Sequence, residues 1–360
     1  MKIKKISPHL DFGLLTIVFF LVAFGVLMVY DASSVTATTE FNNRFYYAKE
    51  QMTGFIIGSV GMLFAVFFNY RHYYKLSLPF LLGALFMLLL VFVPGFGVSA
   101  LGAHRWINLK FINLQPSEIT KLVLVIYLSA WLSAKEKGRL LAFLLLMGLV
   151  VGLIILEPDM GTAVIIIATS IIMYFISGAP VRHFFALIPV FVTGLIGLAV
   201  AAPYRLKRIL TFFDSNSDPL GSSYHVRQAL IALGSGGLFG LGLGKSRQKF
   251  SYLPEASTDS IFAIIAEELG FIGSILLIMV FVVLIYKGYK IAQNAPDPFG
   301  RLLAFGITSW FALQIIINLS SMVALTPLTG IPLPFISYGS SAMVVELYAV
   351  GILINISSKS

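Results

Sequence analysis

Residues 252–287 read "YLPEASTDSIFAIIAEELGFIGSILLIMVFVVLIYK" and place four carboxylates directly against an apolar segment. The acids are Glu255, Asp259, Glu267 and Glu268, whereas residues 269–286 carry no charge at all. An apolar run of that length is typical of a membrane-spanning helix, and an ionised acid inside such a helix is costly. The stretch therefore predicts a membrane protein with polar chemistry at one end of this span.

The composition extends this prediction to the whole chain. Of 360 residues, 58% are hydrophobic and only 11% are charged, and the mean hydropathy is +0.92. A soluble domain cannot hide so much apolar surface, so we expect a polytopic membrane protein. The absence of cysteine excludes disulfides and thiolate metal sites. The basic start "MKIKKISPHLDFG" precedes a full-length apolar span without a small-residue cleavage site, which favours a retained helix over a signal peptide.

Apolar runs of roughly 20 residues, the length that a bilayer-spanning helix needs, recur along the chain. We count ten, near residues 11–30, 53–70, 75–95, 117–134, 139–156, 158–176, 183–202, 260–286, 299–322 and 338–357. The two runs around "LEPDMG" can alternatively form one bent helix. The sequence thus predicts an all-α polytopic membrane protein, a single integral membrane domain over residues 1–360. It has about ten transmembrane helices and a large extracytoplasmic loop, residues 203–258, between helices 7 and 8.

Lysine and arginine in short loops predict which side of the membrane each loop faces. With the N-terminus inside, the inner side carries 13 such residues and the short outer loops carry 4. We therefore expect both chain ends on the cytoplasmic side. The long loop 203–258 escapes this rule. Its basic residues are either a solvated surface or an attraction for an anionic ligand such as a lipid phosphate. They are Arg205, Lys207, Arg208, Arg227, Lys245, Arg247 and Lys249.

Acids within the predicted spans are candidates for function because an unpaired one costs several kcal/mol. Glu118 and Lys121 stand three residues apart on one helical face and can form an ion pair. Glu157 and Asp159 flank a proline at the junction of two spans. Asp159 can cap the start of the second span, or both acids can line a polar cavity.

Glu267 and Glu268 are adjacent, so on a helix they lie about 100° apart and at least one must point into the bundle. We expect Glu267 to have a polar partner on another helix, and Lys121 is the cation at a similar depth. Asp259 precedes Glu267 by eight residues and falls on nearly the same helical face. Taken alone, "STD" at a helix start is also common capping chemistry, which makes an N-cap the structural alternative for Asp259.

The long outer loop contains a short amphipathic run, with Ala229, Leu230 and Leu233 on one side, followed by a glycine-dense turn. Glycine loops can present backbone N–H groups to phosphate. This one matches neither a Walker A motif nor a GxGxxG turn, so it is a weak nucleotide signal. The chain has no HExxH motif and no zinc-ligand spacing, and we expect His104 and His225 to be lone surface side chains.

Four long blocks resemble one known family. They are "HRWINLKFINLQPSEITKLVLVIYLSAWL", "EPDMGTAVII", "TPLTGIPLPFISYGSSAMV" and the segment from "RLKRILTFFD" to "DSIFAIIAEELGFIG". Together they are similar to the SEDS proteins (shape, elongation, division and sporulation), from the first span to the last. Within that family "RWINL", "EPD" and "GLGLGKSRQKFSYLPEA" resemble the division proteins, FtsW, more than the elongation proteins, RodA.

The resemblance implies a ten-helix fold and a peptidoglycan glycosyltransferase that polymerises lipid II at the outer face of the bacterial cytoplasmic (inner) membrane. It also implies a class B penicillin-binding protein as the transpeptidase partner, beside other membrane proteins of division or elongation, and no nucleic acid. Two alternatives from other classes stay open: a lipid II flippase or other transporter, and a non-catalytic scaffold for the transpeptidase. A transporter is disfavoured because no inverted repeat with paired broken helices is visible.

The family's essential aspartate follows its "LPEAHT" block, and the matching position here is Asp259, as the general base that deprotonates the acceptor sugar. Two departures stand beside it, Ser257 where the family usually has His and Ser260 where it usually has Phe. Around Asp259 we expect substrate-binding roles for Glu255, Arg208, Arg205, Lys207, Arg105, Lys121, Glu118, Gln228 and Ser337. Structural or supporting roles are expected for Glu267, Glu157 and Asp159. A divalent cation, Mg²⁺ or Mn²⁺, held by Asp259 or Glu255 is compatible with this chemistry, and the sequence does not decide it.

Overall fold

The computed structural model describes residues 11–93, 97–100, 103–108, 113–134, 139–200, 222–250 and 252–359. Eleven helices lie within these ranges, together with one small sheet. The helices are α1 (Phe12–Phe41), α2 (Tyr46–Phe67), α3 (Arg71–Leu90), α4 (Pro116–Ser133), α5 (Leu140–Leu156), α6 (Met160–Ile176), α7 (Arg182–Val200), α9 (Ser222–Ser235), α10 (Ile261–Asn294), α11 (Pro298–Met322) and α12 (Ser340–Ser357).

Every predicted span corresponds to one helix, and the segment around "LEPDMG" forms two helices, α5 and α6, joined by a short turn. Within the described residues six helices, α1, α2, α3, α10, α11 and α12, are long and apolar enough to cross a membrane. The stretches 140–156, 160–176 and 182–194 are shorter apolar helices. The predicted helical membrane fold is therefore confirmed, while the count of ten crossings stays a prediction.

Several helix starts follow from side chains that cap them. Asp11 precedes α1, and its Oδ1 accepts from the backbone N–H of Leu14 at 2.9 Å. Asp297 precedes α11 and accepts in the same way from Gly300 at 2.7 Å. Asp159 precedes α6 and accepts from Thr162 at 3.1 Å, which confirms the capped start predicted for that span. A carboxylate at this position satisfies an otherwise orphaned donor of the first turn.

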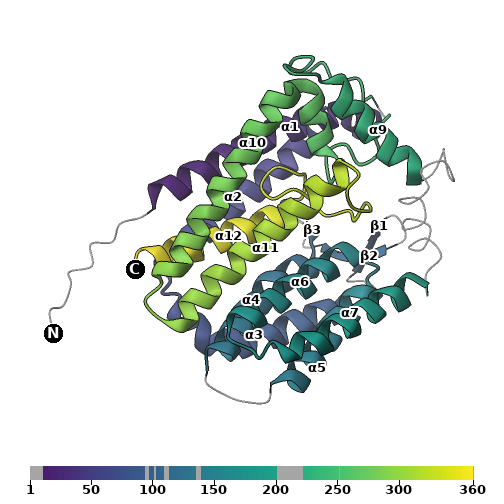
Figure 1. The fold of residues 1–360 in the computed structure, drawn as a ribbon. Coiled ribbons are helices and arrows are strands. Elements are labelled where there is room, and N and C mark those ends of the chain that lie inside the picture. Colours follow the sequence, from purple (N-terminus) through teal and green to yellow (C-terminus); the bar gives the residue numbers. More distant parts are fainter. Residues whose placement is uncertain are drawn as a thin grey trace.

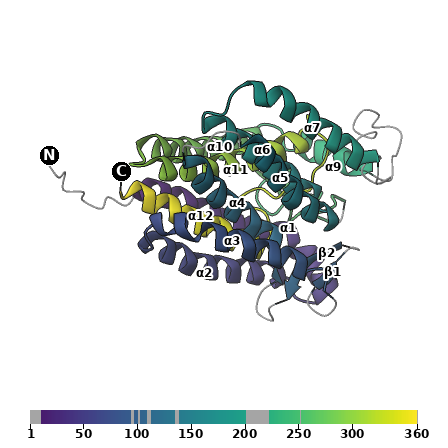
Figure 2. The ribbon, with the colours of Figure 1, turned by 90° about the horizontal axis from the view of Figure 1, so that it is seen from below.

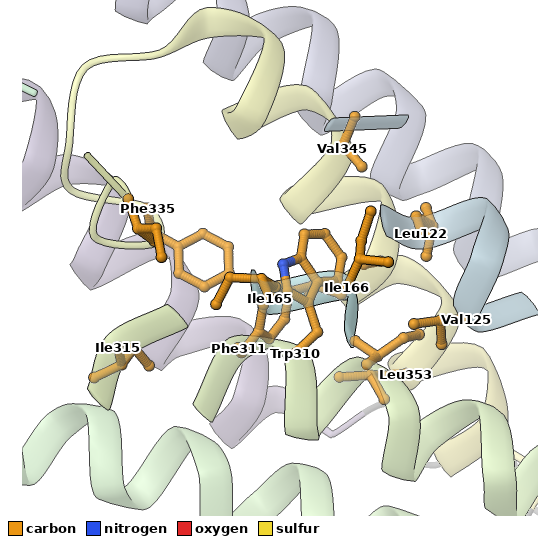
Figure 3. Packing of buried hydrophobic residues seen from close by; sticks show 14 of the residues in the cluster. Leu122, Val125, Ile165, Ile166, Trp310, Phe311, Ile315, Phe335, Val345 and Leu353 are labelled. Carbon is orange, nitrogen blue, oxygen red and sulfur yellow. The ribbon is translucent and has the colours of Figure 1, made fainter. Parts of the chain in front are cut away.

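The helices form an elongated bundle (Figure 1). Most residues of α4, α11 and α12 are buried within it. α11 contacts α10, α4 and α6, and α12 lies along α2. The core at their centre is apolar: Trp310 and Phe311 of α11 pack among side chains of the neighbouring helices (Figure 3). Those neighbours include Leu122 and Val125 of α4, Ile165 and Ile166 of α6, and Leu353 of α12.

Large apolar side chains also cover the outside of the bundle. On α2, for example, Val60, Leu63 and Phe67 are 64%, 53% and 83% exposed. A soluble protein rarely exposes apolar patches this extensive. These faces are suited to contact with lipid.

The two ends of the bundle differ. The start of α1 and the end of α12 lie at one end, whereas α9 and the sheet lie at the other (Figures 1 and 2). The sheet is antiparallel, with β1 (Gly97–Ala100) pairing with β2 (Ala103–Asn108) and β2 with β3 (Asn113–Leu114). This small sheet was not predicted from the sequence. We call the end that carries it the sheet end, and the opposite one the terminal end.

Candidate functional site

The residue singled out by the sequence, Asp259, lies in a turn at the sheet end. Residues 252–260, here the Asp259 turn, are non-helical, and α10 begins only at Ile261. The N-cap of α10 is Ser260, whose side chain makes no capping hydrogen bond. The capping alternative for Asp259 is therefore wrong, and so is its placement on a shared helical face with Glu267.

Three long-range contacts hold the backbone of this turn. Asn318 of α11 is fully buried and donates through Nδ2 to the carbonyl oxygen of Asp259 at 2.8 Å. Its Nδ2 also donates to the carbonyl oxygen of Ile331 at 2.8 Å. From the segment between α11 and α12, Ser337 Oγ donates to the carbonyl of Thr258 at 2.5 Å, and the backbone N–H of Tyr338 donates to Ser257 at 2.8 Å. The turn is thus held by two side chains and one backbone N–H group that are far away in the sequence.

The carboxylates of Glu255 and Asp259 both lie within hydrogen-bond distance of one hydroxyl group. Thr258 Oγ1 lies 2.8 Å from Glu255 Oε2 and 2.9 Å from Asp259 Oδ1. Glu255 is exposed, and its positive φ of 50° turns the chain back towards Asp259. Asp259 itself is half-buried. The structure therefore brings the two acids into one small, accessible patch.

His225 is not a lone surface side chain, contrary to the prediction. It is half-buried on α9, and its Nε2 lies 2.5 Å from Oγ of the fully buried Ser260. The hydroxyl at position 260, one of the two departures from the family pattern, thereby ties α9 to the Asp259 turn. The side chain of His104 lies outside the described residues.

Glu267 and Glu268 accept hydrogen bonds from a loop. The prediction that Lys121 is the partner of Glu267 is therefore wrong. The loop of residues 236–250, here the glycine loop, lies against the N-terminal third of α10. Glu267 accepts from Ser246 Oγ and from the backbone N–H groups of Arg247 at 3.1 Å and Gln248 at 3.4 Å. Glu268 accepts from the N–H groups of Gly244 and Ser246, both at 2.9 Å. Four backbone N–H groups of this loop are thus bonded to the chain's own carboxylates and are not available to a phosphate.

The same contact interrupts α10. Gly270 has φ 69° and ψ −170°, which breaks the helix. The freed carbonyl groups of Glu267 and Glu268 accept from the N–H groups of Leu241 and Gly242, both at 3.0 Å. Inside a membrane protein a broken helix is tolerated where neighbouring backbone satisfies the freed groups, as the glycine loop does here.

Lys249 is a buried anchor, neither a solvated charge nor a free cation for a ligand. Its side chain is 5% exposed, and Nζ lies 2.8 Å from Asp31 of α1 and 3.2 Å from Glu268. Burial disfavours its charge, but the two carboxylates prevail and raise the pKa of Lys249 above its ordinary value. By contrast Arg227, Lys245 and Arg247 are exposed. Lys249, Asp31 and Glu268, here the clasp, join the glycine loop to two helices.

The predicted ion pair of Glu118 and Lys121 is confirmed, at 2.8 Å, with both side chains almost fully buried. Lys121 also donates to Oε1 of Gln314 on α11 at 3.2 Å. Gln314 Nε2 in turn donates to Oε1 of Glu346 on α12 at 3.4 Å. The other carboxylate oxygen of Glu346, Oε2, accepts from the backbone N–H of Phe335. Sequence reasoning missed Glu346, although a lone acid in the last apolar span was the signal that could have found it.

A second buried polar cluster joins the sheet to the α5–α6 junction. Arg105 of β2 donates to the backbone carbonyl of Glu157 at 3.0 Å and to that of Pro158 at 2.5 Å. The carboxylate of Glu157 is fully buried, with no hydrogen-bond partner among the described residues. Burial, and then Asp159, raises the pKa of Glu157 to about 8 although Arg105 acts in the opposite direction. Burial therefore favours the protonated form of Glu157.

The remaining predicted residues lie apart or outside the described ranges. Gln228 is half-buried on α9. Arg205, Lys207 and Arg208 lie outside the described residues. The amphipathic run is confirmed as α9, but with a different buried face: Ala229 is buried and Leu230 is 44% exposed. The neighbouring Ala232 is buried instead.

Among the residues that the structure describes, no group of three or more His, Asp or Glu side chains converges as a metal site. Glu255 and Asp259 offer two carboxylates around one hydroxyl. Mg²⁺ is commonly bound by one or two carboxylates together with the phosphates of a substrate, so this patch fits such an ion only in company with a substrate.

A bundle of apolar helices with a carboxylate patch at one end defines a class, the multi-pass helical membrane proteins with a polar site at one membrane face. A family model described as "Cell cycle protein", covering FtsW, RodA and SpoVE, matches residues 12–360. The chain belongs to this family.

Individual relatives agree with the family match over the full chain. Stage V sporulation protein E of Bacillus subtilis is 42% identical, with all of both chains covered. A probable peptidoglycan glycosyltransferase FtsW of Trichlorobacter lovleyi is 41% identical over 97% of this chain and 93% of its own.

Solved structures are also similar to this chain over nearly its full length. A chain from a peptidoglycan synthase complex aligns with a TM-score of 0.80 at 26% identity, covering 98% of this chain and 99% of its own. RodA of Thermus thermophilus aligns with a TM-score of 0.71 at 27% identity, with 96% of each chain covered. The 41% identity with an FtsW and the 27% identity with a RodA agree with the expectation that the chain is more similar to FtsW.

Proposed function

We propose that this chain is a peptidoglycan glycosyltransferase that polymerises lipid II into glycan strands at the outer face of the cytoplasmic membrane. The observation that carries the proposal is the Asp259 turn, an accessible pair of acids held rigidly at the sheet end. Its support comes from the full-length likeness to proteins named probable peptidoglycan glycosyltransferase, at 38–41% identity.

In the proposed reaction Asp259 is the general base. It takes the proton from the 4-hydroxyl of the acceptor sugar, whose oxygen then forms a bond to the anomeric carbon of the donor. The bond between that carbon and the lipid pyrophosphate breaks, and the pyrophosphate leaves with the bonding electrons. A base must lie within hydrogen-bond reach of the proton that it removes, and the half-buried side chain of Asp259 in an anchored turn is accessible to such a hydroxyl.

The hydrogen bonds around Asp259 make it suitable as a base. Thr258 Oγ1 is shared between the two acids, so it can orient Asp259 without permanently occupying it. Asn318 donates to the backbone carbonyl oxygen of Asp259 and so anchors its main chain. Glu255 is placed to bind a sugar hydroxyl beside the reacting oxygen.

Negative charge develops on the leaving pyrophosphate, and cations that stabilise it would accelerate the reaction. We assign this role to Arg208, with Arg205 and Lys207 beside it, from their place in the sequence. A divalent cation held by Asp259 or Glu255 would supply further charge stabilisation of the phosphate oxygens. The buried residues Glu118 and Lys121, with Arg105, Gln228 and Ser337, are proposed to shape the polar surroundings of the substrate.

Location and partner follow the same reasoning. Asp11 and Ser357 line one pocket at the terminal end, so the two ends of the described chain share one side, proposed to be cytoplasmic. The sheet end then faces outwards, where lipid-linked sugars are polymerised. One similar chain belongs to a complex that coordinates polymerisation and crosslinking, and we propose a class B penicillin-binding protein as the partner here.

The experiment uses the purified full chain, its transpeptidase partner and lipid II in liposomes, and measures glycan strands and lipid II translocation together. Polymer with wild-type protein, lost in Asp259→Ala at unchanged yield, supports the enzyme. Translocation without polymer supports the transporter. Neither activity, with the partner still bound, supports the scaffold.

A further inference from the structure

A pocket lies at the terminal end of the bundle, whereas the Asp259 turn lies at the sheet end. It is formed between the start of α1, the last turns of α10 and the end of α12, with a volume of about 340 Å³. Its polar lining comprises Asp11, Tyr286, Lys287, Lys290, Asn294 and Ser357. This volume is at the small end of the range for ligand sites, which suits a headgroup better than a whole lipid.

The charges in this pocket leave one cation available. Lys287 Nζ pairs with Asp11 Oδ1 at 2.8 Å, so these two charges compensate each other. Burial opposes ionisation of Asp11, but hydrogen bonds from Lys287 and from the N–H of Leu14 prevail and hold the pKa of Asp11 below its usual value. Lys290, almost one turn further along α10, is exposed and has no ion-pair partner among the described residues. The charged side chains that line the pocket therefore leave it with a net positive charge.

The mouth of the pocket lies where the apolar surface of α10 ends. Met279, Val282 and Val283 are 55%, 51% and 41% exposed, which suits a lipid-facing surface. Directly after them, Tyr286 and Tyr289 are 60% and 45% exposed. Exposed tyrosines followed by lysine are typical of the interface between hydrocarbon and headgroups. An acyl chain on the apolar face would bring its headgroup to Lys290.

We propose that this pocket binds the phosphate of an anionic phospholipid, with Lys290 as its main cation. Tyr286 and Asn294, which also line the pocket, can supply uncharged donors, and the ion pair of Asp11 and Lys287 forms part of the wall. Basic pockets between transmembrane helices bind anionic headgroups in this way. The site is separate from the Asp259 turn, and the proposal does not depend on the glycosyltransferase function.

The test uses the full chain in phosphatidylcholine nanodiscs that contain phosphatidylglycerol, and native mass spectrometry to count the retained lipids. Wild-type protein should retain phosphatidylglycerol in preference to phosphatidylcholine. Lys290→Gln should reduce that preference about fivefold, the effect expected of one basic side chain near an anionic surface. The matched control is Lys75→Gln, an exposed lysine at the same end on α3, and it should retain the wild-type preference.

Equal losses in the two variants, or no preference in wild-type protein, would overturn the proposal and leave only a diffuse surface field. A second arm adds inorganic phosphate. Retention of phosphatidylglycerol in excess phosphate supports a lipid site. Thermal stabilisation by phosphate alone, lost in Lys290→Gln and without lipid enrichment, would instead assign the pocket to a soluble anion and overturn it.

Discussion

Asn318 shows how one buried residue can position a reacting group that it does not touch. Its amide donates to the carbonyl groups of Asp259 and Ile331, and so connects α11 to two segments at once. Neither the amide nor its partners can be identified from local sequence, because the hydrogen-bonded residues are 59 and 13 positions away. Residues of this kind are where prediction from the sequence fell short.

Replacing Asn318 by Leu should therefore leave two carbonyl groups without this donor, at a cost of about 1–3 kcal/mol for each group that stays unsatisfied. We expect a lower melting temperature and a larger loss of polymerisation than the stability change alone explains. Thermal unfolding in detergent and the polymerisation rate measure both effects. The matched control is Ser321→Ala on the same helix, which removes only a local hydrogen bond to the carbonyl of Asn318. Full activity in Asn318→Leu would contradict the positioning role.

Glu157 gives a prediction for pH. Its pKa is raised from 4.5 to about 8 by burial in the folded protein. The folded state thus binds a proton that the unfolded state releases, so the free energy of unfolding should fall as the pH rises from about 4.5 to about 8. Glu157→Gln, which cannot ionise, should flatten this part of the pH profile and be more stable than wild type at pH 8. Parallel profiles for the two proteins would show that Glu157 is ionised when folded.

At the scale of elements, the pairing of the glycine loop with the break in α10 organises the sheet end. The sequence indicated both parts, a glycine-dense turn and adjacent acids in an apolar span, but not that they bind each other. Hydropathy identified α10 as one span because its polar interruption is short. The clasp was missed for a related reason: Asp31 and Lys249 are 218 residues apart, and neither is unusual in its local context.

The glycine loop predicts a sharp difference between two glycines. Gly240 has φ 82°, and a Cβ there would overlap the carbonyl oxygen of Glu268. Gly237 also has a positive φ, 54°, but a Cβ there would meet no atom within 4 Å. Gly240→Ala should therefore lower the melting temperature far more than Gly237→Ala, which carries only the cost of its backbone conformation. Similar losses in the two variants would mean that the loop is not packed against α10.

The clasp predicts strong coupling between Lys249 and Asp31. Lys249→Met leaves two acids without their cation and should destabilise the protein by about 3–5 kcal/mol. Adding Asp31→Leu should recover part of this loss, because it removes one of the unpaired charges. A double-mutant cycle of unfolding free energies measures the coupling. Additive effects would show that the pair is not formed in the folded protein.

On the scale of the whole molecule, the two ends of the bundle carry different chemistry. The sheet end holds the Asp259 turn, the clasp and the glycine loop, and the terminal end holds the pocket around Lys290. The arrangement of helices was predictable because bilayer thickness imposes long apolar runs that hydropathy detects. The small sheet, the anchors Ser337 and Tyr338 and the network through Glu346 depend on contacts between distant segments, which a single sequence does not specify.

In the proposed reaction Asp259 is the base of a glycosyl transfer, and Asp259→Asn removes this base while changing little else. Asparagine keeps the size of the side chain and can still accept from Thr258, so the anchored turn should persist, with unchanged yield and melting temperature. A general base contributes about 10²–10⁴-fold to a rate. The measurement is the rate of lipid II polymerisation by the purified variant with its partner. We predict a loss of that size, and a rate within a few-fold of wild type would show that Asp259 is not the base.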